Sequence, residues 1–391
     1  FPGHSGQFYD EDRVFTIDNS LRESLLTKPM PTGEDLLRFG LFLCPDCIGV
    51  VWLMGFVTVE LPHTDEVTFA TRLSNTPQTY DNSPCEILYH NGLVTLEELA
   101  RKKRPTPKLS VTERVEDDTD YVEQQGLLRP GCMISSIKDD GTTSEATAGI
   151  IVERNGEQRL TCSWHVWEEL ANTNKTVTLG DDTPASRKLF RAYSGNTRSP
   201  IGHVVERVGK TDIALMKLDD GVKFQNVFFN GHKPRRLIHH HHLSLGHDKL
   251  EADGFTTGVQ SFICWGARVQ GKREPSAPHP IIDIPPEKDH FLPIPGAAYV
   301  ECDQGIYSVD EDVMFSPPYM RRRAVGAVLV RHNMWIKDEE RFLGIKATRA
   351  RGEVVAMLHL SDLKHRFDTS GRVWIYADSF SPLIKAGWTV V

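Results

Sequence analysis

The sequence predicts an α+β chain in which a small α/β domain precedes an all-β domain made of two halves of about six strands each. Three observations lead to this prediction. Residues 1–105 mix helical and strand-like spacing of apolar side chains, residues 106–126 carry prolines and charge, and many short strands between turn signals follow from residue 127. We therefore expect an N-terminal α/β domain at 1–105, a charged linker at 106–126 and an all-β domain at 127–391.

The N-terminal domain is predicted from four segments. Residues 35–40 and 96–103 have helical spacing, whereas 50–61 and 87–93 resemble strands, the second broken by an Asn91-Gly92 turn signal. The longest apolar stretch, residues 47–57, is too short for the roughly 20 residues that cross a bilayer, so we expect no membrane partner. No family is recognised in this domain, and its role is not readable from its residues.

The all-β domain is predicted strand by strand, and its halves divide near residue 225. The strands expected in the first half are 132–137, 147–152, 159–163, 176–179, 203–208 and 212–218. Those expected in the second half are 258–264, 297–301, 326–331, 353–360 and 372–376, with a short closing helix from Ser381.

Three motifs stand in a fixed order along this domain. Thr161–Val166 has the sequence Thr-Cys-Ser-Trp-His-Val, Thr211–Leu218 has Thr-Asp-Ile-Ala-Leu-Met-Lys-Leu, and a Gly-apolar strand begins at Gly326. Together they resemble the chymotrypsin-like (trypsin-like) peptidases over residues 127–391. The resemblance implies a double six-stranded β-barrel, with His165 as the general base and Asp212 as the residue that orients it.

The nucleophile position of this resemblance is occupied by Val325, immediately before Gly326, and valine has no lone pair to attack a carbonyl. Arg323 stands where the family keeps a glycine, whose conformational freedom lets the loop point its N–H groups at the oxyanion. We therefore expect a pseudopeptidase in which His165 and Asp212 persist as a vestigial, hydrogen-bonded pair. The alternative is an active endopeptidase with a displaced nucleophile.

Candidates for a displaced nucleophile are Cys302, Ser308 and Ser316, although none precedes a Gly-apolar strand. Two further features allow a third hypothesis, a module that binds an acidic ligand or a metal. Arg321, Arg322 and Arg323 form a basic cluster suited to carboxylates or phosphate, or a solvated surface. The tract His239–His242 suits a transition metal or a solvated loop. No other ligands frame it at metal-site spacing, so we expect no metal and no cofactor.

Composition limits the partner and the compartment. A net charge of −8 argues against a general nucleic-acid binder. Seven scattered cysteines favour reduced thiols and an intracellular, cytoplasmic protein. The first residue is Phe, as in a processed product or a piece of a longer polypeptide. We expect a catalytically inactive protein that works through a protein partner or self-assembly, as a scaffold, a regulatory module or a structural component such as a virion protein.

Overall fold

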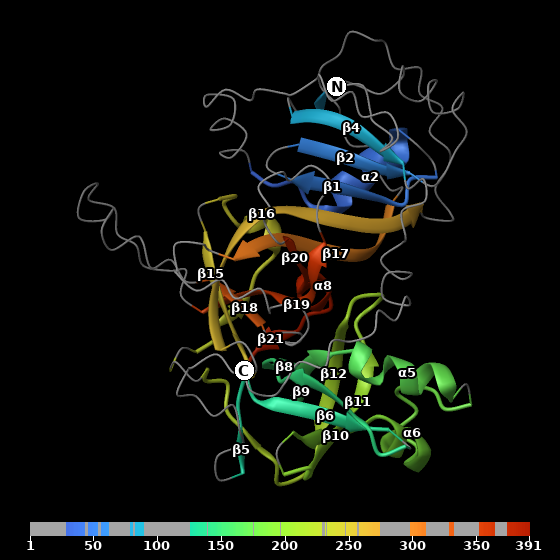
Figure 1. The fold of residues 1–391 in the computed structure, drawn as a ribbon, viewed down its shortest axis with the longest axis vertical. Helices are drawn as coiled ribbons and strands as arrows, with labels where there is room; N and C mark the ends of the chain where they lie inside the picture. The colour runs from blue at the N-terminus through green and yellow to red at the C-terminus, as the bar shows by residue number, and fades with distance from the viewer. Residues whose placement is uncertain are drawn as a thin grey trace, which may run out of the picture. The chain divides into compact units, whose positions relative to one another are not determined.

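The chain divides into two compact units in a computed structural model (Figure 1). The first unit takes residues 1–113, 241–246 and 265–303, and the second takes 114–240, 247–264 and 304–391. The structure describes residues 29–43, 46–53, 56–61, 79–80, 83–89, 126–138, 140–174, 176–195, 197–228, 231, 233–246, 248–255, 258–273, 298–309, 328–331, 352–363 and 374–391. The expected boundaries at 105 and 126 stay predictions, because residues 90–125 lie outside that description.

In the described residues, the first unit is a sheet with one α-helix. Its elements are α2 (Gly33–Leu43), β1 (Gly49–Leu53), β2 (Phe56–Leu61), β3 (Thr79–Tyr80), β4 (Ser83–Tyr89), the second part of β16 (Gly258–Arg273) and the first part of β17 (Ala298–Val309). The strand order is β17-β16-β1-β2-β4-β3, in which β1 pairs antiparallel with β16 and β2, β3 pairs antiparallel with β4, and β2 pairs parallel with β4. The helix predicted at 35–40 is confirmed as α2. The stretch predicted as strand at 50–61 is observed as two antiparallel strands, β1 and β2.

Helix α2 packs closely against β1. A side chain at Gly40 would lie 2.4 Å from Val50 Cγ2 and 2.7 Å from Cys47 Sγ, so only a glycine allows this approach. The buried Leu36 and Leu37 complete the apolar side of the helix. The unit therefore has a core between α2 and its sheet.

A buried ion pair lies across β1 in the first unit. Arg268 of β16 donates from Nε and Nη2 to Glu60 Oε2 of β2 at 3.1 and 2.9 Å, with both side chains about 7% exposed. Gly49 of β1 lies between the two outer strands, and a Cβ there would be 2.6 Å from Glu60 Oε2. The missing side chain at Gly49 leaves room for the charged pair.

The first sheet of the second unit is antiparallel. Its strands are β6 (Met133–Ile137), β7 (Thr143–Thr147), β8 (Ile151–Arg154), β9 (Glu157–Ser163), β10 (Arg191–Ser194), β11 (Pro200–Arg207), β12 (Ile213–Leu218) and β21 (Thr389–Val390). Their order is β21-β8-β9-β12-β11-β10-β6-β7 (Figure 1). Two helices, α5 (His165–Thr173) and α6 (Pro184–Leu189), are inserted between β9 and β10. Short β5 (Leu127–Leu128) and β13 (Lys223–Phe224) pair with each other.

Residues 148–150 carry the chain from one side of this sheet to the other. Ala148 N donates to Cys132 O at 2.8 Å, beside β6, and Gly149 N donates to Thr161 O of β9 at 2.9 Å. The single strand predicted at 147–152 is therefore wrong: β7 ends at Thr147 and β8 begins at Ile151. The break lies at Gly149, where a Cβ would be 2.2 Å from Thr161 Oγ1.

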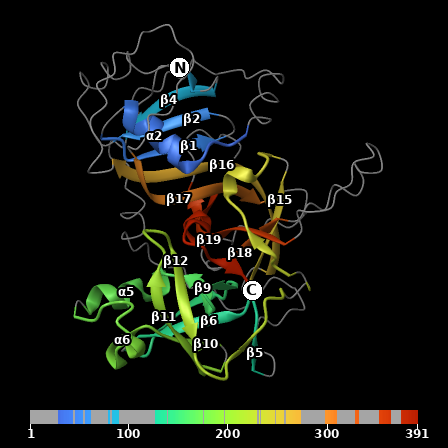
Figure 2. The same ribbon diagram turned by 180° about the vertical axis from the view of Figure 1, so that it is seen from behind.

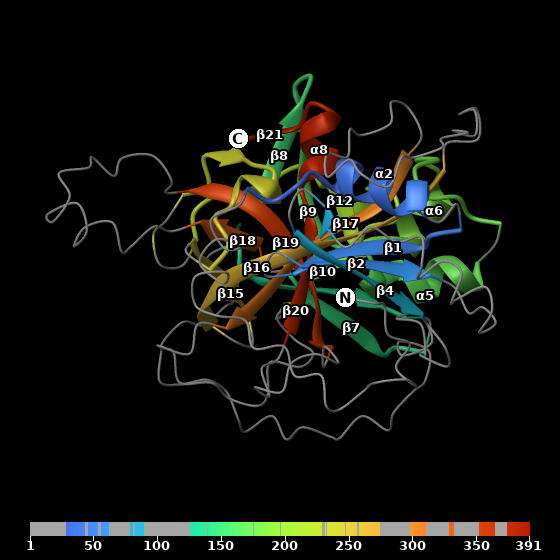
Figure 3. The same ribbon diagram turned by 90° about the horizontal axis from the view of Figure 1, so that it is seen from above.

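The other strands of the second unit belong to its C-terminal half. They are β14 (Arg236–Leu237), β15 (Lys249–Gly254), the first part of β16, β17 (Ala298–Val309) from Gln304, β18 (Val328–Arg331), β19 (Glu353–Leu363) and β20 (Trp374–Ser379). Neighbours pair antiparallel in the order β15-β18-β19-β20-β17, and β14 adds in parallel to β19. A 3-10 helix spans His240–His242, and helix α8 (Ser381–Lys385) precedes β21. Figure 3 shows α8 and β21 beside β8.

Two apolar cores lie within the second unit, and β12 contributes to both. Ala214 and Met216 enter one core with Leu160 and Trp167, whereas Ile213 and Leu215 enter the other. Alternation with a period of two thus buries both faces of β12, which explains its uninterrupted apolar run. The second core includes Val354 and Met357 of β19, Phe380, and Leu383 of α8.

The described residues are mostly β, with antiparallel sheets and few helices. This agrees with the all-β part of the α+β prediction. Ten of the eleven strands predicted in the all-β domain overlap an observed strand, and the closing helix is confirmed as α8. The strand predicted at 176–179 is wrong: after α5 the chain turns, with Val177 N bonded to Asn174 O, and Val177 and Leu179 pack as turn residues on the core. No helix in the described residues is long and apolar enough to cross a membrane.

Candidate functional site

The pairing of β9 with β12 brings His165 and Asp212 together. The register sets Ser163 against Ile213, and Trp164 N donates to Asp212 O at 2.7 Å. His165 follows at once as the first residue of α5, where the chain leaves the sheet. Residues 47 positions apart in sequence are therefore fixed side by side by the strand register.

Asp212 accepts three hydrogen bonds through its carboxylate. Oδ1 accepts from His165 N at 2.7 Å, and Oδ2 accepts from Ser163 Oγ and faces His165 Nδ1, each at 2.8 Å. Asp212 is 3% exposed and Ser163 is fully buried. The carboxylate selects the imidazole tautomer with the proton on Nδ1 and fixes the ring plane.

A second buried carboxylate binds the backbone of Asp212. Asp378 of β20, which is 0% exposed, accepts the backbone N–H of Asp212 on Oδ2 at 2.5 Å. Its other oxygen accepts from Gln304 Nε2 of β17 at 2.7 Å, across the β17–β20 pair. Both halves of the second unit are joined at this point, since Asp212 precedes β12 and Asp378 belongs to β20.

The imidazole of His165 is open on its other side. Its side chain is 41% exposed, and no described residue makes a hydrogen bond to Nε2. With Nδ1 facing the carboxylate, Nε2 carries the lone pair that accepts a proton in general-base catalysis. The His165–Asp212 pair thus has the geometry of a base and its orienting acid.

The residues expected opposite Nε2 lie outside the described residues. This applies to Val325, Gly326 and the cluster Arg321–Arg323, and also to the alternative nucleophile Ser316. The strand that the motif requires next is observed as β18 (Val328–Arg331), and the first two residues of the prediction, 326–327, lie outside the described residues.

Two of the remaining thiol and hydroxyl candidates are placed in strands. Cys302 and Ser308 both belong to β17. Among the described residues, Cys162 lies nearest to the pair in sequence, but burial raises the pKa of its thiol and the Asp212 charge raises it further. A thiol that holds its proton is a poor nucleophile, so Cys162 is a core residue.

The first two residues of the histidine tract, His239 and His240, have a structural role in the second unit. His239 Nδ1 lies 2.9 Å from Ser381 Oγ, and His240 Nδ1 lies 3.1 Å from Ser379 Oγ. The two serine hydroxyls are 2.7 Å apart, so these side chains join the start of η1 to the start of α8. No group of potential metal ligands forms among the described residues.

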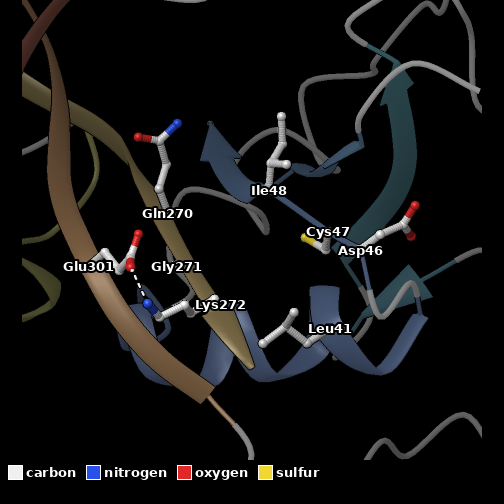
Figure 4. Close-up of a pocket in the computed structure, with 8 residues that line it drawn as sticks. All are labelled: Leu41, Asp46, Cys47, Ile48, Gln270, Gly271, Lys272 and Glu301. Carbon is white, nitrogen blue, oxygen red and sulfur yellow. Dashed lines mark ion pairs between the residues drawn. The ribbon is translucent and has the colours of Figure 1, made fainter. Parts of the chain in front are cut away.

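A separate pocket of about 430 Å³ lies in the first unit (Figure 4). Leu41 and Ile48 give it apolar walls, and Lys272 Nζ pairs with Glu301 Oε1 at 3.1 Å along one side. Asp46, Cys47, Gln270 and Gly271 complete the lining. Cys47 Sγ donates to Gly49 O at 3.2 Å, so this thiol is part of the local structure.

Sequence reasoning missed two members of the His165–Asp212 site. Ser163 is the last residue of β9, two positions before His165, and only the pairing of β9 with β12 places its hydroxyl beside Asp212. Asp378 also had no local signal, because it lies 166 residues beyond Asp212. The helix α5, which opens on the histidine, was also missed, although Val166, Trp167 and Leu170 have helical spacing.

No family model matches the chain, and no curated protein matches it. Solved structures with some likeness to it include a glutamic acid specific serine protease with a histidine triad in substrate binding, at TM-score 0.35 and 10% identity over 68% of this chain and 100% of that one. Cellulomonas bogoriensis chymotrypsin follows at 0.32 and 12% over 68% and 98%, and tobacco vein mottling virus protease at 0.24 and 9% over 69% and 83%. TM-scores this low carry no argument about fold or function.

Proposed function

We propose that the second unit is a trypsin-like double-barrel module that acts through binding or assembly and not through peptide hydrolysis. The observation that carries the proposal is the set of hydrogen bonds that Asp212 makes. Its carboxylate and its backbone N–H bond to β9, to the start of α5 and to β20, so the residue is a structural junction. A junction of this kind is retained when catalysis is lost, because its removal leaves buried donors unpaired.

The sequence supports the loss of catalysis. Val325 offers no nucleophile, and Arg323 replaces the glycine of the oxyanion loop. The double barrel is supported by residues 148–150, whose backbone hydrogen bonds to Cys132 and Thr161 link β7 and β8 into a continuous path around the first sheet. We further propose a protein partner or self-assembly and, from cysteine usage alone, an intracellular location.

The proposal predicts that the wild-type chain carries no His165-dependent reactivity toward a fluorophosphonate probe. The double variant Arg323→Gly/Val325→Ser restores both missing elements and is expected to gain labelling. Adding His165→Ala is expected to slow that labelling by about 100-fold or more, as loss of a general base does. Labelling is measured by intact-protein mass spectrometry over time.

Wild-type labelling that disappears in the single variant His165→Ala would overturn the proposal and establish an active hydrolase. If the double variant stays unlabelled while retaining its circular dichroism spectrum, the surrounding site has diverged further than two residues. That outcome supports a binding role over a recently inactivated enzyme.

An active endopeptidase with a displaced nucleophile is the second candidate function. It is favoured by one observation: the exposed imidazole of His165, whose Nε2 receives no hydrogen bond from the described residues. A fluorophosphonate probe separates this candidate from the first, with Ser316→Ala and His165→Ala as the comparison variants. Labelling that is lost in Ser316→Ala and also requires His165 would support it.

A further inference from the structure

The second unit contains another histidine, His203, which is buried and makes no hydrogen bond to the described residues. His203 of β11 is 6% exposed, and neither ring nitrogen has a hydrogen-bond partner in the described residues. Buried polar side chains are nearly always paired, so an unpaired imidazole needs an explanation.

Charged side chains surround His203 on every packed element. The strand register puts Arg191 of β10 and Lys217 of β12 directly beside it on the same sheet face. Asp219, which follows β12, holds Arg191 through Oδ2 at 2.5 Å. The segment before α6 supplies Asp182, whose Oδ1 lies 3.6 Å from His203 Nε2.

Asp182 already has a partner in α6. Arg187 donates from Nε to Oδ1 at 2.6 Å and from Nη2 to Oδ2 at 2.8 Å. The hydrogen bond from Arg187 lowers the pKa of Asp182 to about 2, so this carboxylate stays ionised at any pH near neutrality. Asp182 also has a left-handed backbone, with φ 49°.

Burial and the surrounding charges act on the protonation of His203. Burial lowers its pKa below the usual 6.5 and is the largest effect, the Asp182 and Asp219 charges raise the pKa, and the Arg187 and Arg191 charges lower it further. The ring is therefore neutral at pH 7 and has a waiting acceptor 3.6 Å away. A proton taken up on acidification would place a third cation between Arg191 and Lys217. Asp219 is already bonded to Arg191, whereas Asp182 Oδ1 lies 3.6 Å from His203 Nε2 and can accept the new N–H.

We propose that His203, Asp182 and Arg187 form a pH-sensitive clasp between α6 and the sheet (Figure 2 shows α6 near β10 and β11). At neutral pH, Asp182 binds Arg187 and fixes α6. On acidification, solvent protonates His203 on Nε2. The new Nε2–H donates a hydrogen bond to Asp182 Oδ1, and Arg187 loses its ion pair with Asp182 and becomes solvated. The clasp is a property of this surface and does not depend on catalysis at His165.

The effect on stability has a definite sign. Between the lowered folded pKa of His203 and the value near 6.5 of the unfolded chain, the unfolded chain binds more protons. Stability attributable to His203 is thus complete above about pH 6.5 and is lost as the pH falls. His203→Leu removes this dependence and, at pH 7, replaces an unpaired polar ring with an apolar group of similar size.

The clasp is tested by hydrogen exchange of the full-length chain at pH 7.0 and pH 5.5, with rates corrected for the intrinsic effect of pH. Peptides covering residues 180–190 are expected to exchange about threefold faster at pH 5.5, the change that follows from losing one exposed bidentate ion pair. Peptides covering the β8–β9 hairpin serve as the internal reference and are expected to show no change.

Two variants decide the outcome. His203→Leu is expected to keep α6 slow at both pH values. Asp182→Asn, at an exposed position that does not threaten folding, is expected to make α6 fast at both. A wild-type response that persists unchanged in either variant, or no response in the wild type, would overturn the clasp.

Discussion

Replacing Asp212 with alanine is expected to lower the free energy of unfolding by about 3 to 5 kcal/mol. The substitution leaves Ser163 Oγ and the backbone N–H of His165 without their acceptor, and the first is fully buried. It also frees the imidazole to rotate. Denaturant titration followed by far-ultraviolet circular dichroism measures the loss.

Asp212→Asn is the matched control, because it keeps the size and the backbone contact with Asp378. The amide can donate where the carboxylate accepted if the Ser163 hydroxyl rotates and the His165 proton moves to Nε2. We expect less than half the loss of the alanine variant, with the tautomer change visible in two-bond ¹H–¹⁵N spectra. If the alanine variant is as stable as the wild type, Asp212 is not a structural junction.

Gly202→Ala is expected to cost about 3 kcal/mol, because the added methyl group meets backbone atoms. A Cβ on Gly202 would lie 2.2 Å from Lys217 O and 3.0 Å from Leu218 Cα. Neither atom can move without parting β11 from β12, the strands that carry His203 and follow Asp212. Thermal and denaturant unfolding measure the effect.

Gly156→Ala separates this overlap from the ordinary cost of losing a glycine. Gly156 has φ 78°, and a Cβ there would meet nothing within 4 Å. Its substitution carries only the left-handed backbone penalty of about 1 to 2 kcal/mol. If both variants lose the same stability, close approach of β11 and β12 is not what requires glycine at Gly202.

The sequence was sufficient for the His165–Asp212 pair, since a strand followed two residues later by histidine and a strand preceded by aspartate are local patterns. The order of the motifs along the chain supplied the roles of the two residues through the resemblance to the trypsin-like peptidases. The length of strands was less predictable: β16 and β17 extend well past the segments expected, because their later residues pair with strands from other parts of the chain. Pairing at long range leaves no local signal.

The polar residues that support the pair were beyond prediction for the same reason. Asp378 has its partner 166 positions away, and His240 has its partner 139 positions away. A histidine tract looks alike in sequence whether it binds a metal, is solvated or fastens a helix. The positions of Ser379 and Ser381 show that His239 and His240 fasten α8.

The pairing of β21 with β8 has a consequence for how the second unit is made. Thr389 pairs with Glu153 and Val390 with Val152, and Asn226 Nδ2 donates to Val391 O at 3.3 Å. The edge of a sheet that begins near residue 133 is thus completed by residues more than 200 positions later. During synthesis the edge of β8 stays unpaired until residues 389–391 have left the ribosome. Pairing between residues so far apart in sequence raises the contact order, which slows folding and favours help from chaperones.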